Sequence, residues 1–266
     1  ADGSIAPRTL QVPFGFDPPP PLDDSTIRRY RAAWGLDPDD SYMLWTGGLW
    51  PWMDPLAVVT AFEAAVNDFP TAHLVFPGTK ALSGIGQALA QELCTRAQGS
   101  PCRDRIHCVD WIPAADWPHV AGGARIHVQA DRPGWEAWIS NRTRLLESLA
   151  HLLPVATTNH DPLTRSLQAN WLVRSAPTLA EALVSAWHAF PMPEGHPELL
   201  VDLEQERDRY RWDVCVEALL KAAREGFTAS PDKGQLNPIK TWIEQYPIPP
   251  PPGPLQKLWD RTLGHR

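Results

Sequence analysis

Short apolar runs alternate with segments of helical periodicity along most of the chain. The apolar runs predict strands at 42–47, 72–78, 105–112, 124–130, 153–158 and, more weakly, 170–175. Helical periodicity predicts helices over 54–69, 86–99, 113–123 (short and irregular), the stretch after Asn141, 162–167 and 178–190. Units repeated in this way favour a parallel sheet covered on both faces. The sequence therefore predicts a doubly wound, Rossmann-like α/β domain.

The flanks of this pattern differ from it. Residues 12–24 are proline-rich and predict a linker that leaves a short strand, whereas 198–226 predicts a helix followed by a proline-rich tail. We therefore expect a linker with the first strand over 1–24, a Rossmann-like domain over 25–197 and a helical segment with the tail over 198–266. The sequence shows no internal repeat.

The composition argues against several classes of function. The chain has 266 residues and a net charge of −7, which argues against a broad nucleic-acid surface. Its start lacks the pattern of a signal peptide, and no apolar run is long enough to cross a bilayer. Four cysteines show no paired CxxC spacing, and nine histidines form no HExxH pattern, so we expect no metal site. These features favour a cytoplasmic protein.

A polar stripe follows the predicted helix after Asn141, which is the candidate N-cap. Arg144, Glu147 and His151 fall on one side of this helix, away from its leucines. By itself the stripe is typical of a solvated face with an Arg–Glu pair worth a few tenths of a kcal/mol. The alternative hypothesis is that the start of the helix binds a charged small ligand, because it lies at a strand-to-helix corner with Glu136 just upstream.

Other corner residues also allow two interpretations. Gly47 and Gly48 follow a strand, where backbone amides approach a phosphate or simply form a tight turn. Lys80 follows the next strand and is either a phosphate contact or a solvated side chain. Trp52 either stacks on a base or sugar, or fixes its loop to the domain.

Two segments resemble a known family. The residues Trp45, Gly47, Gly48, Trp52, Asp54 and Pro55 match an LWxGGxxxWxDP segment, and Glu136, Arg142, Arg144 and Pro154 match a later ExxxAxRxR…P segment. Over about residues 9–190 the chain resembles the C-terminal, donor-binding domain of GT-B-fold glycosyltransferases of the glycogen-synthase/sucrose-synthase-like group (glycosyltransferase family 4-like).

The resemblance implies roles for individual residues. Glu147, seven residues before Pro154, would bind the donor ribose, and Glu136 is the acid nearest to the position that contacts the donor sugar. Arg142 and Arg144 would neutralise the diphosphate. The remaining candidate substrate-binding residues are Gly47, Gly48, Trp52, Lys80, Asn141 and Thr143.

The resemblance also implies the reaction and its partners. The donor would be a nucleotide sugar, UDP- or GDP-linked, with no other cofactor and no metal, and transfer would retain the anomeric configuration. A carbohydrate or lipid-linked acceptor would bind an N-terminal GT-B domain that this chain lacks, so the fragment alone would be inactive.

Two departures from the family pattern keep another function open. Leu152 replaces a glycine of the family, which would crowd the pocket, and Lys80 is only a partial counterpart of a basic pair that many relatives carry. A degenerate, non-catalytic binding or scaffold module is therefore the alternative. A dehydrogenase is disfavoured because no GxGxxG motif precedes a suitable acid.

Overall fold

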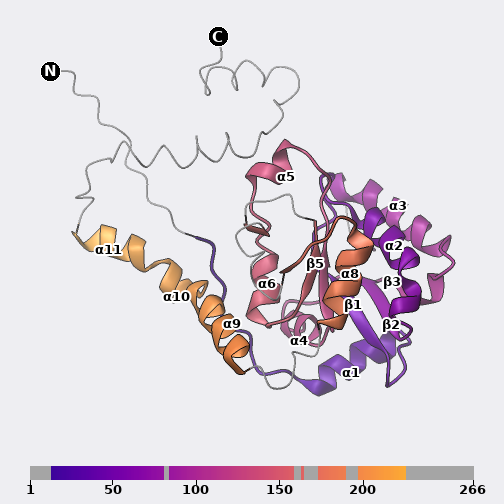
Figure 1. Ribbon diagram of the computed structural model, residues 1–266, viewed down its shortest axis with the longest axis horizontal. Helices are drawn as coiled ribbons and strands as arrows, with labels where there is room; N and C mark the ends of the chain where they lie inside the picture. Colours follow the sequence, from indigo (N-terminus) through magenta and orange to yellow (C-terminus); the bar gives the residue numbers. More distant parts are fainter. Residues whose placement is uncertain (1–12, 81–83, 159–162, 165–172, 190–196, 226–266) are drawn as a thin grey trace, which may run out of the picture.

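A computed structural model describes residues 13–80, 84–158, 163–164, 173–189 and 197–225. Six parallel strands form one sheet in the order β3-β2-β1-β4-β5-β6. Their bounds are β1 Ser41–Trp45, β2 Ala72–Phe76, β3 Ile106–Cys108, β4 Ile126–Gln129, β5 Val155–Thr157 and β6 Val173–Arg174. The doubly wound α/β fold is thus confirmed (Figure 1). No described helix is long and apolar enough to span a membrane.

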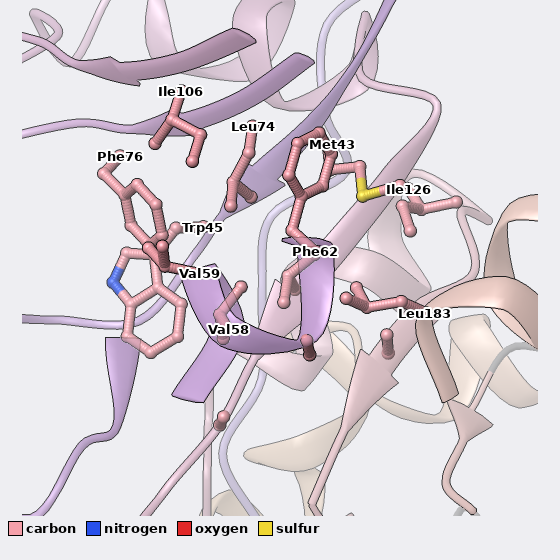
Figure 2. Packing of buried hydrophobic residues seen from close by; sticks show 14 of the residues in the cluster. Met43, Trp45, Val58, Val59, Phe62, Leu74, Phe76, Ile106, Ile126 and Leu183 are labelled. Carbon is pink, nitrogen blue, oxygen red and sulfur yellow. The ribbon is translucent and has the colours of Figure 1, made fainter. Parts of the chain in front are cut away.

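Three helices cover one face of the sheet: α2 (Pro55–Ala64), α3 (Gln87–Gln98) and α8 (Leu179–His188). Alternate strand residues such as Met43 and Trp45 point to this side, where Met43 lies beside Phe62 and Trp45 beside Phe76 (Figure 2). All four are buried. Each large apolar side chain buried here contributes about 1.5–3 kcal/mol, so this layer is the main core.

The other face is covered by α1 (Asp24–Ala33), α4 (Trp117–Gly122) and α6 (Leu145–Ala150). Tyr42 and Leu44 point to this side, in alternation with the residues of the first core. The Tyr42 hydroxyl donates to the carbonyl of Val120 at 2.6 Å, which satisfies a buried polar group.

Several predicted boundaries are confirmed, and two helices are new. Asp54 caps α2 by accepting from the Ala57 amide at 3.1 Å, with Pro55 in the first turn. The sequence pattern did not indicate α1, which Asp23 caps, or the short α5 (Trp135–Ile139). Short 3₁₀ turns lie at Val66–Asp68, Gly84–Gly86 and Arg103–Arg105.

One expectation about a helix end is wrong. Asn141 does not cap α6, because the helix begins at Leu145 with Arg144 at its N-cap position and without a side-chain cap. The described part of the stretch 198–226 is helical, and it forms three helices: α9 (Pro197–Arg209), α10 (Trp212–Cys215) and α11 (Glu217–Glu225).

The break between α9 and α10 has a clear physical cause. Phe16 of the N-terminal segment donates to the carbonyl of Tyr210 at 2.9 Å and accepts from the amide of Trp212 at 3.1 Å. These backbone groups are therefore used by a parallel bridge and cannot continue a helix. This bridge is the described counterpart of the short strand that was expected over 1–24.

Some expectations lie outside the described residues. They are most of the helix near 162–167, residues 1–12 and the proline-rich tail. The domain boundaries at 24 and 197 stay predictions.

Candidate functional site

The strand order reverses between β1 and β4, and this is where doubly wound sheets bind ligands beyond their carboxyl ends. The chain leaves β1 into the loop 46–54 and leaves β4 at Ala130 and Asp131. The short helix α5 follows β4 at this end of the sheet (Figure 1). Of the candidate residues, Gly47, Gly48, Trp52, Glu136 and Arg142 belong to these connections.

The loop after β1 is fastened to the end of β4. The amide of Thr46 donates to Val128 at 3.1 Å, the amide of Asp54 donates to Ala130 at 3.0 Å, and the amide of Arg132 donates to Trp52 at 2.8 Å. Bonds at both ends of the loop fix its path across the switch point.

Both glycines of this loop are required by close packing. A Cβ at Gly47 would lie 2.6 Å from the Trp45 ring and 2.7 Å from Cε of Met53. A Cβ at Gly48 would lie 2.4 Å from Nε1 of Trp50. Side chains therefore explain why these positions are glycine, and the indole of Trp50 occupies the space over Gly48.

Arg142 lies in a buried charge cluster at the end of the sheet. Its Nη1 and Nη2 donate to the carboxylate of Glu136 at 3.0 and 2.7 Å, and Nη2 lies 3.4 Å from Oδ2 of Asp131. The side chain of Arg142 is 7% exposed and that of Asp131 is 0% exposed. Ser140 and Thr158 add hydrogen bonds to the same carboxylates.

The cluster has an electrostatic consequence. Burial raises the pKa of Glu136, but hydrogen bonds from Arg142 and Ser140 outweigh it, so the pKa lies below its ordinary value. The carboxylates of Glu136 and Asp131 both face the Arg142 guanidinium. Arg142 thus joins the end of β4 to the chain before α6, and an anion that approaches it would compete with Glu136.

Glu147 lies in different surroundings, on α6. Its Oε1 is 3.6 Å from Nε2 of His151 and its Oε2 is 3.7 Å from Nη1 of Arg144. Burial raises the pKa of Glu147, but the interactions of its carboxylate with the side chains of His151 and Trp117 outweigh burial, so the pKa lies below its ordinary value. The group is an ionised hydrogen-bond acceptor at neutral pH.

Glu147 lines a groove of about 460 Å³. One wall is the segment 14–20, and the other is formed by Thr143, Arg144, Leu146 and His151 with Pro118 of α4. The side chain of Arg144 is 54% exposed, which leaves it free to turn toward a ligand in the groove. Glu147, Arg144 and Thr143 are the candidate residues that the structure brings together here.

A buried histidine supports this part of α6 and was not a candidate. Nε2 of His127 lies 2.9 Å from the carbonyl oxygen of Ala121, which can only accept, so Nε2 carries the proton. Nδ1 therefore accepts from the hydroxyl of Ser148 at 2.9 Å. Burial lowers the pKa of His127 to about 4. The signal in the sequence was a histidine inside an otherwise apolar strand.

Leu152 takes the place of the expected glycine at the end of α6. Its φ is +52°, a left-handed value that leucine rarely adopts, and it follows the C-cap residue His151. The side chain packs beside Leu146, Leu149 and Leu203 of α9. Leu152 is thus directed toward the C-terminal helices, and the described lining of the groove does not include it.

The other candidates lie apart. Lys80 is exposed after β2 and lines a separate groove beside the edge strand β3. Asn141 is exposed between α5 and α6. Across the described part of the chain, no three or more His, Cys, Asp or Glu residues are grouped so that they could hold a metal ion.

Comparisons with solved structures identify the fold. A UDP-forming α,α-trehalose-phosphate synthase from Burkholderia xenovorans matches 82% of this chain and 52% of its own, with 14% identity and a TM-score of 0.59. A Rickettsia africae glycosyltransferase matches 79% and 54%, with 13% identity and a TM-score of 0.58. Anabaena Alr3699/HepE, solved with UDP-glucose, matches 77% and 53%, with 14% identity and a TM-score of 0.58.

No protein-family model and no curated protein matches the sequence. The chain spans about half the length of each of these three solved chains. At such low sequence identity, the comparisons show the fold alone. This chain therefore has the Rossmann-like fold of one half of a GT-B glycosyltransferase.

Proposed function

We propose that this chain is the donor-binding half of a glycosyltransferase that transfers a sugar from a UDP- or GDP-linked donor. In this proposal transfer retains the anomeric configuration and needs no metal. The acceptor, a carbohydrate or a lipid-linked sugar, binds mainly to a second GT-B domain outside this chain, and the chain alone does not turn over.

The observation that carries the proposal is the groove beside α6. It contains an ionised acceptor, Glu147, next to an exposed guanidinium, Arg144. A carboxylate accepts hydrogen bonds from the two hydroxyls of a ribose, and a guanidinium forms charge-assisted bonds with a phosphate. These two groups therefore suit the ribose and the diphosphate of a nucleoside diphosphate.

The proposed role of each residue follows from its surroundings. Glu147 binds the ribose, held in place by His151. Arg144 stabilises the negative charge that develops on the leaving diphosphate, a contribution of the kind that costs about 2.7–4 kcal/mol when one donor is removed. Arg142 and Glu136 set the shape of the loop between β4 and α6, with Glu136 nearest to the donor sugar.

Isothermal titration calorimetry of the chain with UDP, GDP, UDP-glucose and GDP-mannose tests the proposal. We expect micromolar binding of one nucleotide family, weakened at least tenfold by Glu147→Gln and by Arg144→Ala. Glu92→Gln and Arg103→Ala, both on exposed positions away from the groove, are matched controls and retain binding.

A non-catalytic module is the second candidate, and the Arg142 cluster favours it. Arg142 is engaged by Glu136 and Asp131, so this guanidinium is already neutralised. In a module without donor binding, none of the four nucleotides would bind the chain, and that calorimetric result would replace the first proposal by the second.

A further inference from the structure

We propose that Trp50 and Trp52 form a rigid aromatic platform that stacks against the pyranose ring of a sugar at the carboxyl end of the sheet. The inference rests on the proposed function, and it names the residues that would bind the sugar. It concerns a surface separate from the groove that contains Glu147.

The two indoles are stacked on one another and remain partly exposed. Their ring centroids are 5.5 Å apart and their planes differ by 6°. Trp50 is 48% exposed and Trp52 is 39% exposed. Neither belongs to the buried core clusters. Two stacked tryptophans that keep this much area in water are not explained by core packing.

The pair is held before any ligand arrives. The amide of Met53 donates to the carbonyl of Trp50 at 2.9 Å, which closes a turn with Pro51 at its second position. Met53 is buried and pairs with Asp131, so the turn is anchored to β4. Gly48 makes room for the Trp50 ring, because a Cβ there would lie 2.4 Å from Nε1. Preorganisation of this kind lowers the entropic cost of binding.

The aromatic faces of the platform favour a sugar ring as the ligand. A pyranose ring has one face of C–H groups and a rim of hydroxyls, so it stacks on an indole while its polar rim stays in water. The platform lies at the switch point of the sheet, where small ligands bind, rather than on a helix face. A nucleobase could also stack, but the groove of Glu147 already accommodates the nucleoside.

The pyranose could belong to the donor or to the acceptor. A donor sugar would stack only when linked to its nucleotide, which is anchored at Glu147 and Arg144. An acceptor sugar would stack by itself. Free saccharides and nucleotide sugars therefore distinguish the two sources.

Saturation-transfer difference NMR on the full chain tests the platform. The probes are the methyl α- and β-glycosides of glucose, galactose, mannose and N-acetylglucosamine, together with trehalose, UDP and UDP-glucose. We expect ring C–H signals from at least one saccharide or from the glucose of UDP-glucose, reduced at least fivefold by Trp50→Ala or Trp52→Ala. Trp111→Ala is the matched control, since this indole is 67% exposed and packs over Gly78 rather than in the stacked pair.

The outcomes test the platform and the proposed function separately. The platform proposal is overturned if no pyranose signal depends on Trp50 or Trp52, or if these variants remove only the signals of the uracil base. UDP-glucose that binds with full affinity to both variants would leave the proposed function intact. Conversely, saccharide signals that depend on the pair without any nucleotide binding would support the platform and contradict the nucleotide site.

Discussion

Arg142 donates through both terminal nitrogens to the carboxylate of Glu136, at 3.0 and 2.7 Å. The resemblance implied a phosphate-binding arginine at this position, whereas the geometry shows an arginine that ties a loop to the end of β4. Its second partner, Asp131, has a side chain that is 0% exposed. A structural contribution of Arg142 must therefore be measured before any catalytic one is assigned.

Arg142→Ala should destabilise the fold by about 3–5 kcal/mol, because it leaves the buried charge of Asp131 without this guanidinium. Urea denaturation measures the change. The double variant Asp131→Asn/Arg142→Ala should recover part of the loss, since it also removes the carboxylate that the guanidinium faced. Equal stability of Arg142→Ala and the parent would show that the cluster does not hold the loop.

Arg144→Ala should lower turnover with little change in folding stability. Its side chain is 54% exposed and its pair with Glu147 at 3.7 Å is long, so folding should change by less than about 1 kcal/mol. In an intact enzyme, turnover should fall about a hundredfold or more, because an exposed cation at the leaving group is lost. Steady-state kinetics beside thermal unfolding of the same variant gives both values. Unchanged turnover would remove Arg144 from the site.

Leu152 offers a test of backbone strain. Glycine tolerates φ +52° and alanine does not, so Leu152→Gly should be more stable than Leu152→Ala by about 1 kcal/mol. At the exposed helical position Thr95 the order should reverse, with Thr95→Gly about 1 kcal/mol less stable than Thr95→Ala. The same order of glycine and alanine at both positions would contradict the strained conformation.

The buried His127 predicts a pH dependence. Its folded pKa of about 4 lies below the unfolded value of about 6.5, so the unfolded state binds more protons between these values. The stability that the neutral, buried His127 contributes to the fold is fully present above about pH 6.5 and is lost as the pH falls toward 4. Urea unfolding at pH 7.5 and 4.5 should show a smaller difference for His127→Gln than for the parent chain. The exposed His188→Gln should behave like the parent, and an unchanged difference in His127→Gln would refute the assignment.

The sheet could be predicted because apolar runs such as 72–78 and 124–130 alternate with helical periods. Helix α1 was missed because its one buried residue is the polar Thr26, so its apolar periodicity is weak. The capping residue Asp23 was its available signal. The break after α9 depends on Phe16, nearly two hundred residues away, and no local pattern reports such a contact.

The site was only partly accessible to sequence reasoning. Spacing along α6 correctly associated Arg144, Glu147 and His151, because a helix places these positions on one side. The pairing of Arg142 with Asp131 depends on how the loop from β4 returns, which periodicity does not encode. Asp131 lies two residues after the buried strand β4, and an acid at such a position was the signal that could have pointed to the cluster.

The central claim is that a nucleoside diphosphate binds beside α6, and hydrogen–deuterium exchange locates it most directly. With a saturating nucleotide sugar, peptides that cover 143–151 and 14–20 should exchange more slowly, and Glu147→Gln should abolish this protection. Protection confined to the edge of β3, or absent everywhere with every nucleotide sugar tried, would contradict the account.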